Sequence, residues 1–137
     1  RFYTVELIIA LEFLHSEGII HRDIKTANLF VSQTGHLLLG DFGFAKDFHK
    51  KPSLPERVNL ALGSPYEASP EIYLNQYYSF GVDFWAATVS MFYMLTGHPP
   101  WYDENPRELR RQVLEDDPVY FDEDPVDEVT RDFVESV

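Results

Sequence analysis

The chain has 137 residues, of which 45% are hydrophobic and 15% aromatic, and its formal net charge is −12 at pH 7. This composition is typical of a packed globular protein and excludes an intrinsically disordered chain. The sequence contains no cysteine, so it has no disulfide framework, and it has no run of about 18 apolar residues that could span a membrane.

The negative charge is concentrated near the C-terminus, where residues 102–137 include 13 acidic residues and 4 arginines. Phosphate binding needs a basic face, so this charge argues against nucleic acid as a partner. We interpret most of these acids as a solvated helical face. The alternative is that they attract a basic substrate segment.

The first predicted element is a helix from Arg1 to Glu17, with Gly18 as its C-cap. Apolar residues recur at helical spacing and predict a broad buried face: Phe2, Val5, Leu7, Ile8, Leu11 and Leu14, widened by Ile9, Ala10 and Phe13. Ile19 and Ile20 then predict a very short buried strand.

A polar loop, IHRDIKTAN, occupies residues 20–28, and two apolar runs follow it at Leu29–Val31 and Leu37–Leu39. The turn between these runs contains Gly35, so the pair predicts a β-hairpin. The sequence Asp-Phe-Gly comes directly after, at residues 41–43. A hairpin would hold Asn28, at its start, at a fixed distance from Asp41, at its end.

Residues 47–67 contain prolines and charges but no clear period, which is typical of a functional or irregular segment. Ser69 and Pro70 then predict the N-cap and first residue of a short helix. Further helices are predicted at Gly81–Gly97, Asn105–Glu115 and Val126–Val137. The Gly81–Gly97 helix is apolar on most sides and is expected to cross the core. It contains Asp83, a carboxylate that needs hydrogen-bond donors if it is buried.

The order H-R-D-x-K-x-x-N, then D-F-G, then S-P-E and V-D-x-W resembles the C-terminal lobe of a serine/threonine protein kinase. The wording GHLLLGDFGFAK is similar to the group containing cyclic-AMP-dependent kinase. The resemblance implies a mainly α fold with a short β-hairpin (α+β), a partial kinase domain over residues 1–137 without the N-terminal lobe, and an activation segment over residues 41–71.

The resemblance also implies the roles of the polar residues. Asp23 would accept the proton of the substrate hydroxyl, and Lys25 would place a positive charge near the γ-phosphate of ATP. Asn28 and Asp41 offer the hard oxygen ligands that Mg²⁺ prefers. Phe30 would belong to the nucleotide site with Lys25, Asn28 and Asp41. The resemblance makes these further residues structural supports of the site: His21, Arg22, Phe42, Gly43, Ser64, Glu71 and Asp83.

The sequence departs from the related kinases in its activation segment. Leu60 occupies the position where relatives carry a phosphorylated hydroxyl, so we expect activation without phosphorylation there, unless Ser53 substitutes. Arg22 would then pair with a carboxylate such as Glu56. Ala27 and Tyr93 stand where basophilic relatives often carry Glu, which leaves the substrate consensus open.

The expected function is transfer of the ATP γ-phosphoryl group to Ser or Thr of a protein substrate inside the cell, in cytoplasm or nucleus. We expect no secretory leader, because residues 1–10 have neither a cleavage site nor a clean apolar core. Alone, these residues should be inactive, because the N-terminal lobe is missing and Glu71 would lack its arginine partner. The alternatives are a pseudokinase or truncated kinase acting as a binding scaffold, and a small-molecule phosphotransferase of related fold. The oligomeric state stays open.

Overall fold

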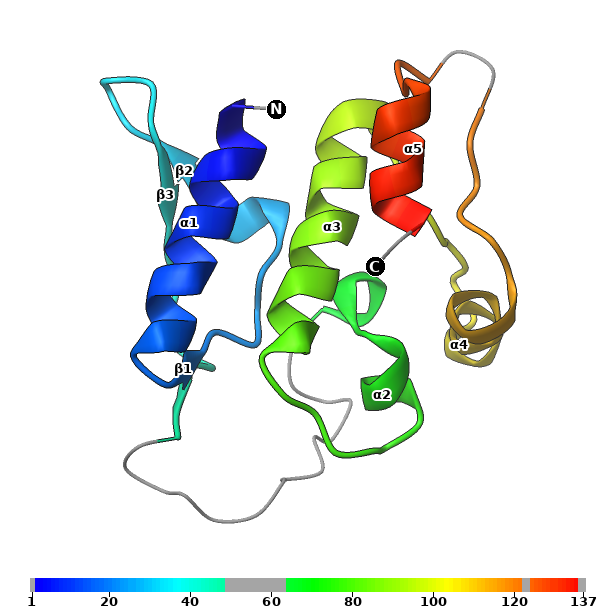
Figure 1. Cartoon of the computed structure of the whole chain (residues 1–137). Helices are drawn as coiled ribbons and strands as arrows, with labels where there is room; N and C mark the ends of the chain where they lie inside the picture. The colour runs from blue at the N-terminus through cyan, green and yellow to red at the C-terminus, as the bar shows by residue number, and fades with distance from the viewer. Residues whose placement is uncertain (1, 49–63, 122–123, 136–137) are drawn as a thin grey trace.

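The computed structural model describes residues 2–48, 64–121 and 124–135, which form five α-helices and two small antiparallel sheets. Figure 1 shows α3 in the middle of the molecule, with α1 and a hairpin on one side and α4 and α5 on the other. The helices are α1 (Phe2–Ser16), α2 (Pro70–Tyr73), α3 (Gly81–Thr96), α4 (Pro106–Glu115) and α5 (Glu128–Glu135). The prediction of a mainly helical fold with a short hairpin is confirmed.

Helix α1 packs against α3 and the hairpin through one face, where Leu7, Leu11 and Leu14 are buried. Gly18 follows with a φ of 68°, a left-handed conformation that glycine adopts at little cost, and the helix ends there as predicted. The expected broad buried face is wrong, since Phe2 and Phe13 are 57% and 64% exposed. The elements packed on α1 lie on its leucine side, so Val5 and Ile9 are also exposed, while Ile8 and Ala10 are half-buried.

The strands form two separate pairs. In the hairpin, β2 (Leu29–Val31) pairs antiparallel with β3 (Leu37–Leu39), which confirms the prediction. The short strand β1 (Ile19–Ile20) is also confirmed, and it pairs with β4 (Lys46–Asp47), which the sequence analysis did not predict. Because β1 precedes the polar loop and β4 follows the Asp-Phe-Gly turn, this pairing brings the two ends of the region together.

Helix α3 carries the core, and nine of its residues are buried, among them Asp83. Its C-terminal turn is less buried than predicted, since Met94 and Leu95 are 44% and 41% exposed. The helix ends at Gly97, which has a φ of 83° and donates its N–H to the carbonyl of Tyr93. No described helix is long and apolar enough to cross a membrane.

The predicted N-cap of the short helix is confirmed in position, and the later helices lie close to their predicted ranges. Ser69 is the N-cap of α2, followed by Pro70 in its first turn, although the serine side chain makes no capping bond. Asn105 caps α4 by accepting a hydrogen bond from the N–H of Arg107. Helix α5 begins at Glu128, two residues later than predicted.

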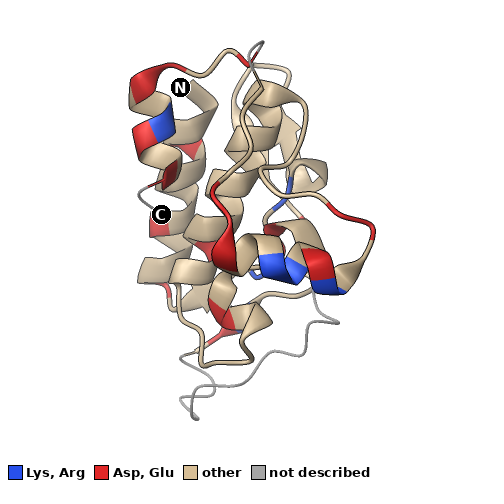
Figure 2. Ribbon diagram, turned by 90° about the vertical axis from the view of Figure 1, so that its right-hand side faces the viewer, with Lys and Arg blue, Asp and Glu red and all other residues tan. Residues whose placement is uncertain are grey.

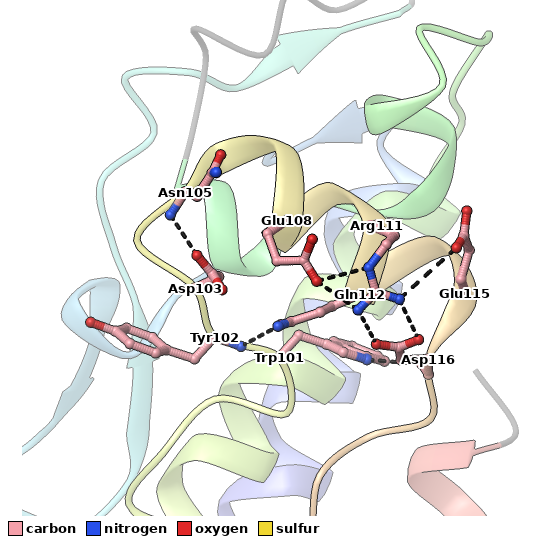
Figure 3. Close-up of polar contacts among 9 residues, drawn as sticks. All are labelled: Trp101, Tyr102, Asp103, Asn105, Glu108, Arg111, Gln112, Glu115 and Asp116. Carbon is pink, nitrogen blue, oxygen red and sulfur yellow. Dashed lines mark hydrogen bonds and ion pairs between the residues drawn. The ribbon is translucent and has the colours of Figure 1, made fainter.

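The loop before α4 is tied to the end of that helix, as Figure 3 shows. The indole of Trp101 donates to the carbonyl of Asp116, and the N–H of Tyr102 donates to the side chain of Gln112. Arg111 bridges Glu108 and Asp116 on the exposed side. Figure 2 shows how Asp and Glu outnumber Lys and Arg along the ribbon, in keeping with the net charge of −12.

Candidate active site

Asp23 is held in place by its neighbours in the loop between β1 and β2. Its side chain is buried, and the Lys25 ammonium lies 3.1 Å from Oδ1 and 2.9 Å from Oδ2. The amide nitrogen of Asn28 donates to the backbone carbonyl of Asp23 at 2.8 Å and to its Oδ2 at 3.0 Å. The three residues predicted to act together are therefore in contact. The carboxylate can accept further protons or donors only in the directions these contacts leave open.

Asn28 and Asp41 are linked through the base of the hairpin. The N–H of Gly40 donates to the carbonyl of Asn28 at 2.9 Å, which joins the residue before Asp41 to the loop. Asp41 is exposed, has a φ of 59°, and accepts a hydrogen bond from the N–H of Gly43 at 3.2 Å. A Cβ at Gly43 would lie 3.1 Å from Oδ1 of Asp41, so a larger residue there would push this carboxylate out of place.

The donor set fits Mg²⁺. Both hydrogen bonds of the Asn28 side chain run through its nitrogen, and among the described residues its oxygen accepts none. The exposed Asp41 carboxylate supplies a second hard oxygen, and Mg²⁺ commonly binds through one or two protein ligands together with phosphate oxygens and water. Within residues 2–48, 64–121 and 124–135 no three His, Cys, Asp or Glu side chains gather as a metal site. Asn28 and Asp41 are thus the residues that would hold the ion.

The ring of His21 joins the loop to the Asp-Phe-Gly turn. It is fully buried, and its Nε2 lies 3.0 Å from the carbonyl of Gly40, while Nδ1 lies 3.4 Å from the N–H of Asp23. A hydrogen on Nε2 and a lone pair on Nδ1 satisfy both contacts. The ring also meets Phe42 edge to face at a centroid distance of 4.9 Å. Phe30, half-exposed on β2, covers Gly40, where a Cβ would lie 2.8 Å from its ring.

Asp83 supports the loop from below. Its carboxylate is completely buried and accepts the backbone N–H groups of His21 and Arg22, each at 2.8 Å. The Nε2 of His15 lies 2.9 Å from Oδ2. A buried carboxylate is tolerated only when its oxygens have donors, and here both oxygens do. The expected contact between Asp83 and the loop backbone is present.

Arg22 adopts a backbone conformation that is unusual for a residue other than glycine, with a φ of 68°. Its Nε donates to the carbonyl of Phe44 at 2.6 Å, and one terminal nitrogen donates to the hydroxyl of Tyr78 at 3.0 Å. The expected partner Glu56 lies outside the described residues, as do Ser53 and Leu60 of the predicted activation segment.

Ser64 shares a small cavity of about 50 Å³ with Asp23, Glu67 and Ser69. Ser64 was expected to support the site, but among the described residues its hydroxyl makes no hydrogen bond to Asp23 or Lys25. Glu67 Oε2 and Ser69 Oγ are buried there without a described hydrogen-bond partner. Burial raises the pKa of Glu67 above its usual range, and the Asp23 charge adds to this. Its own backbone N–H and Lys25 act in the opposite direction.

Glu71, on α2, is half-buried rather than buried. Among the described residues, no Lys or Arg side chain forms an ion pair with it. The partial exposure of Glu71 lessens the penalty expected for an unpaired charge, because water reaches the carboxylate.

A groove of about 760 Å³ runs beside the loop, from Thr26 and Glu67 to a set of aromatic rings. Tyr66 and Tyr102 stack in it at a centroid distance of 5.6 Å, and Tyr93 lines it further along. The described residues that line the groove include no Lys or Arg.

The sequence matches the protein kinase domain over residues 1–136. The chain belongs to the protein kinase family. Serine/threonine-protein kinase gad8 of Schizosaccharomyces pombe is 40% identical over 134 residues, which are 98% of this chain and 23% of gad8. cAMP-dependent protein kinase catalytic subunit 3 of Drosophila melanogaster is 40% identical over 83% of this chain and 18% of its own length. The human cAMP-dependent protein kinase catalytic subunit PRKX is 38% identical over 82% of this chain and 30% of its own length.

This kinase chain spans less than a third of the length of each of these relatives, which are named serine/threonine or cAMP-dependent kinases. The similarity confirms the predicted family, including its likeness to the cyclic-AMP-dependent group. The positions of the site residues come from the structure rather than from these names.

Three residues of the kinase site were missed by the sequence analysis: His15, Glu67 and Tyr78. His15 stands in the last turn of an apolar helix, and its position beside an otherwise apolar face was the available signal. Tyr78 contacts Arg22 across 56 positions of the chain, a pairing for which the local pattern contains no signal. Glu67 follows Pro65 and Tyr66, and these residues form no motif that would have marked the glutamate as part of the site.

Proposed function

We propose that this chain is the C-terminal lobe of a serine/threonine protein kinase and contributes its catalytic loop. The observation that supports this most directly is the buried Asp23, contacted by Lys25 and Asn28, with Asn28 tied through Gly40 to the Asp41 turn. One group for the hydroxyl and two oxygen donors for a metal thus lie in the loop before and the turn after a single β-hairpin. Phosphoryl transfer asks a protein mainly for such alignment.

Each residue has a separate task in this proposal. Asp23 orients the substrate hydroxyl and accepts its proton, and it need not be a strong base because the transition state is loose. Lys25 neutralises charge near the transferring group and keeps the Asp23 carboxylate in place. Asn28 and Asp41 would hold Mg²⁺, which when bound neutralises the phosphates of ATP. Phe30 would contact the nucleotide from β2.

The proposed acceptor is a Ser or Thr of a protein, because a lysine two residues after the aspartate resembles serine/threonine kinases. The groove beside Thr26 offers room for the flanking peptide, and its freedom from described Lys and Arg favours a basic segment. Use of ATP as donor places the reaction inside the cell, in cytoplasm or nucleus.

The proposal gives residues 1–137 the role of a partial kinase domain, with an activation segment over residues 41–71. It expects little turnover from these residues alone, because tight ATP binding needs an N-terminal lobe. The contact between Lys25 and Asp23 favours chemistry over a pure scaffold role, since a scaffold does not need an aligned carboxylate.

The test is phosphotransfer by the full-length protein from ATP to serine-containing peptides, compared with its Asp23→Asn variant. Loss of the proton acceptor should lower kcat by about 10²–10⁴-fold, the usual contribution of general base catalysis. ATP binding should be retained, because Asn28 and Asp41 are unchanged. An Asp23→Asn variant with the wild-type rate would refute the proposed function. Residues 1–137 purified alone should bind ATP weakly and show no measurable rate.

A further inference from the structure

The backbone of Arg22 is held in a conformation that needs support. A left-handed φ strains the backbone of a residue other than glycine, so neighbouring contacts must outweigh this strain. Arg22 has a φ of 68° and stands directly before Asp23. Its N–H is fixed by Asp83 at 2.8 Å, and its guanidinium is fixed by the Phe44 carbonyl and the Tyr78 hydroxyl. Relaxation of Arg22 would turn the peptide that carries Asp23.

Of the two groups that hold the guanidinium, Tyr78 is the more rigid. Phe44 belongs to the exposed turn after Asp-Phe-Gly and is 36% exposed. Tyr78 is 6% exposed and packs in a core cluster with Ile20 and Val82. Its ring position is thus set by the fold, and the hydroxyl presents a fixed acceptor to Arg22. Ile20 also leads into the loop, so ring and loop share one packing unit.

Both side-chain partners of Arg22 are electrically neutral. None of the described Asp and Glu side chains lies within ion-pair distance of its guanidinium, and the nearest carboxylate contact, from Asp83, is made to its backbone N–H. A hydrogen bond from a charged donor is stronger than one between neutral groups. The phenol of Tyr78 therefore supplies Arg22 with a neutral anchor whose position is set by core packing.

We propose that Tyr78 is a positioning residue for phosphoryl transfer, which acts through Arg22 to hold Asp23 in its catalytic orientation. This inference rests on the proposed function. Removal of the hydroxyl would leave Arg22 with one side-chain anchor, on an exposed turn, and would let the loop depart from its left-handed conformation. Substrate binding uses other residues, so the effect belongs to kcat rather than to KM.

The test uses the full-length protein and the Tyr78→Phe variant, which keeps the buried ring and removes only the hydroxyl. We expect kcat to fall about tenfold, equal to about 1.4 kcal/mol of transition-state stabilisation, with KM for ATP and peptide within about twofold. The matched control is Tyr77→Phe, the same change one residue earlier, at a ring that is 61% exposed. It should keep the wild-type kcat.

A double-mutant cycle with Arg22→Gln separates positioning from general stability. Arg22→Gln should lower kcat at least as far as Tyr78→Phe, and the second change should add no further loss. A Tyr78→Phe enzyme with kcat within twofold of wild type would overturn the inference, as would an undiminished loss in the Arg22→Gln background. If Tyr78→Phe folds poorly, an Arg22→Gln enzyme with wild-type kcat overturns it alone. A wild-type protein without phosphotransfer would instead refute the proposed function.

Discussion

The two halves of the proposed site differ in how firmly the fold holds them. In the catalytic loop, His21, Asp23 and Asn28 are each at most 5% exposed, and a buried carboxylate fixes the backbone from below. In the turn that follows the hairpin, Phe42 is 49% exposed, and among the described residues the Asp41 carboxylate is hydrogen-bonded only within the turn. The side that meets the hydroxyl is therefore preformed in this chain.

The difference follows from the neighbours of each half. The loop between β1 and β2 packs against α3, so its polar groups must find hydrogen-bond partners inside the protein. The turn is attached to the same core through Gly40 and the ring of His21, and its remaining groups face outward. A site built in this way can keep the acceptor side rigid while the nucleotide side adjusts to its ligand.

Asp83→Ala should break the rigid half and have the largest effect. The change leaves the N–H groups of His21 and Arg22 and the ring of His15 without their acceptor, so the loop should lose about 3–5 kcal/mol of local stability. Hydrogen exchange at the His21 and Arg22 amides of the full-length protein measures this loss. Asp132→Ala, at an exposed acid on α5, is the control and should leave both amides protected. Unchanged exchange in Asp83→Ala would contradict the assigned support.

Gly43→Ala should disturb the exposed half alone. The added Cβ would lie 3.1 Å from Oδ1 of Asp41, so the carboxylate must shift by a few tenths of an ångström. We expect KM for Mg·ATP to rise about tenfold, because a displaced carboxylate would bind the Mg²⁺ less tightly, with little change in stability. Gly81→Ala is the control, because its nearest contact would be the Ser79 hydroxyl at 3.8 Å. Equal KM values for both variants would count against Asp41 as a metal ligand.

Most elements of the two halves were predictable from sequence, but the difference in burial between the halves was not. The polar loop, the hairpin and Asp83 were predicted from motif spacing, hydrophobic periodicity and turn residues, all of which can be read directly from the sequence. The structure has them where they were expected. The exposure of the outer face of α1 was not predictable, because an apolar stripe does not reveal which of its residues find a partner. Strand β4 is two residues long and has no pattern of its own. The contact of Tyr78 with Arg22 depends on tertiary packing.

Glu67→Gln should sharpen the comparison at the edge of the rigid half, with the smallest effect. Burial raises the pKa of this carboxyl above its ordinary value of 4.5, so between these two values the folded protein binds more protons than the unfolded chain. The stability of the wild type therefore falls as pH rises through that interval.

The neutral glutamine avoids this loss, and we expect it to stabilise the full-length protein by about 1 kcal/mol at pH 7, the lower end of the penalty for an unpaired buried group. Below pH 4 both forms are uncharged and the difference should disappear. The free energy of unfolding measured from pH 4 to 8 tests this. Glu12→Gln, at an exposed position on α1, is the control, and its stability difference from wild type should stay constant over this range. A Glu67→Gln variant that is less stable than wild type at pH 7 would contradict this prediction. It would mean that attraction to Lys25 outweighs burial and repulsion by Asp23, so that the Glu67 charge is stabilised in the folded protein.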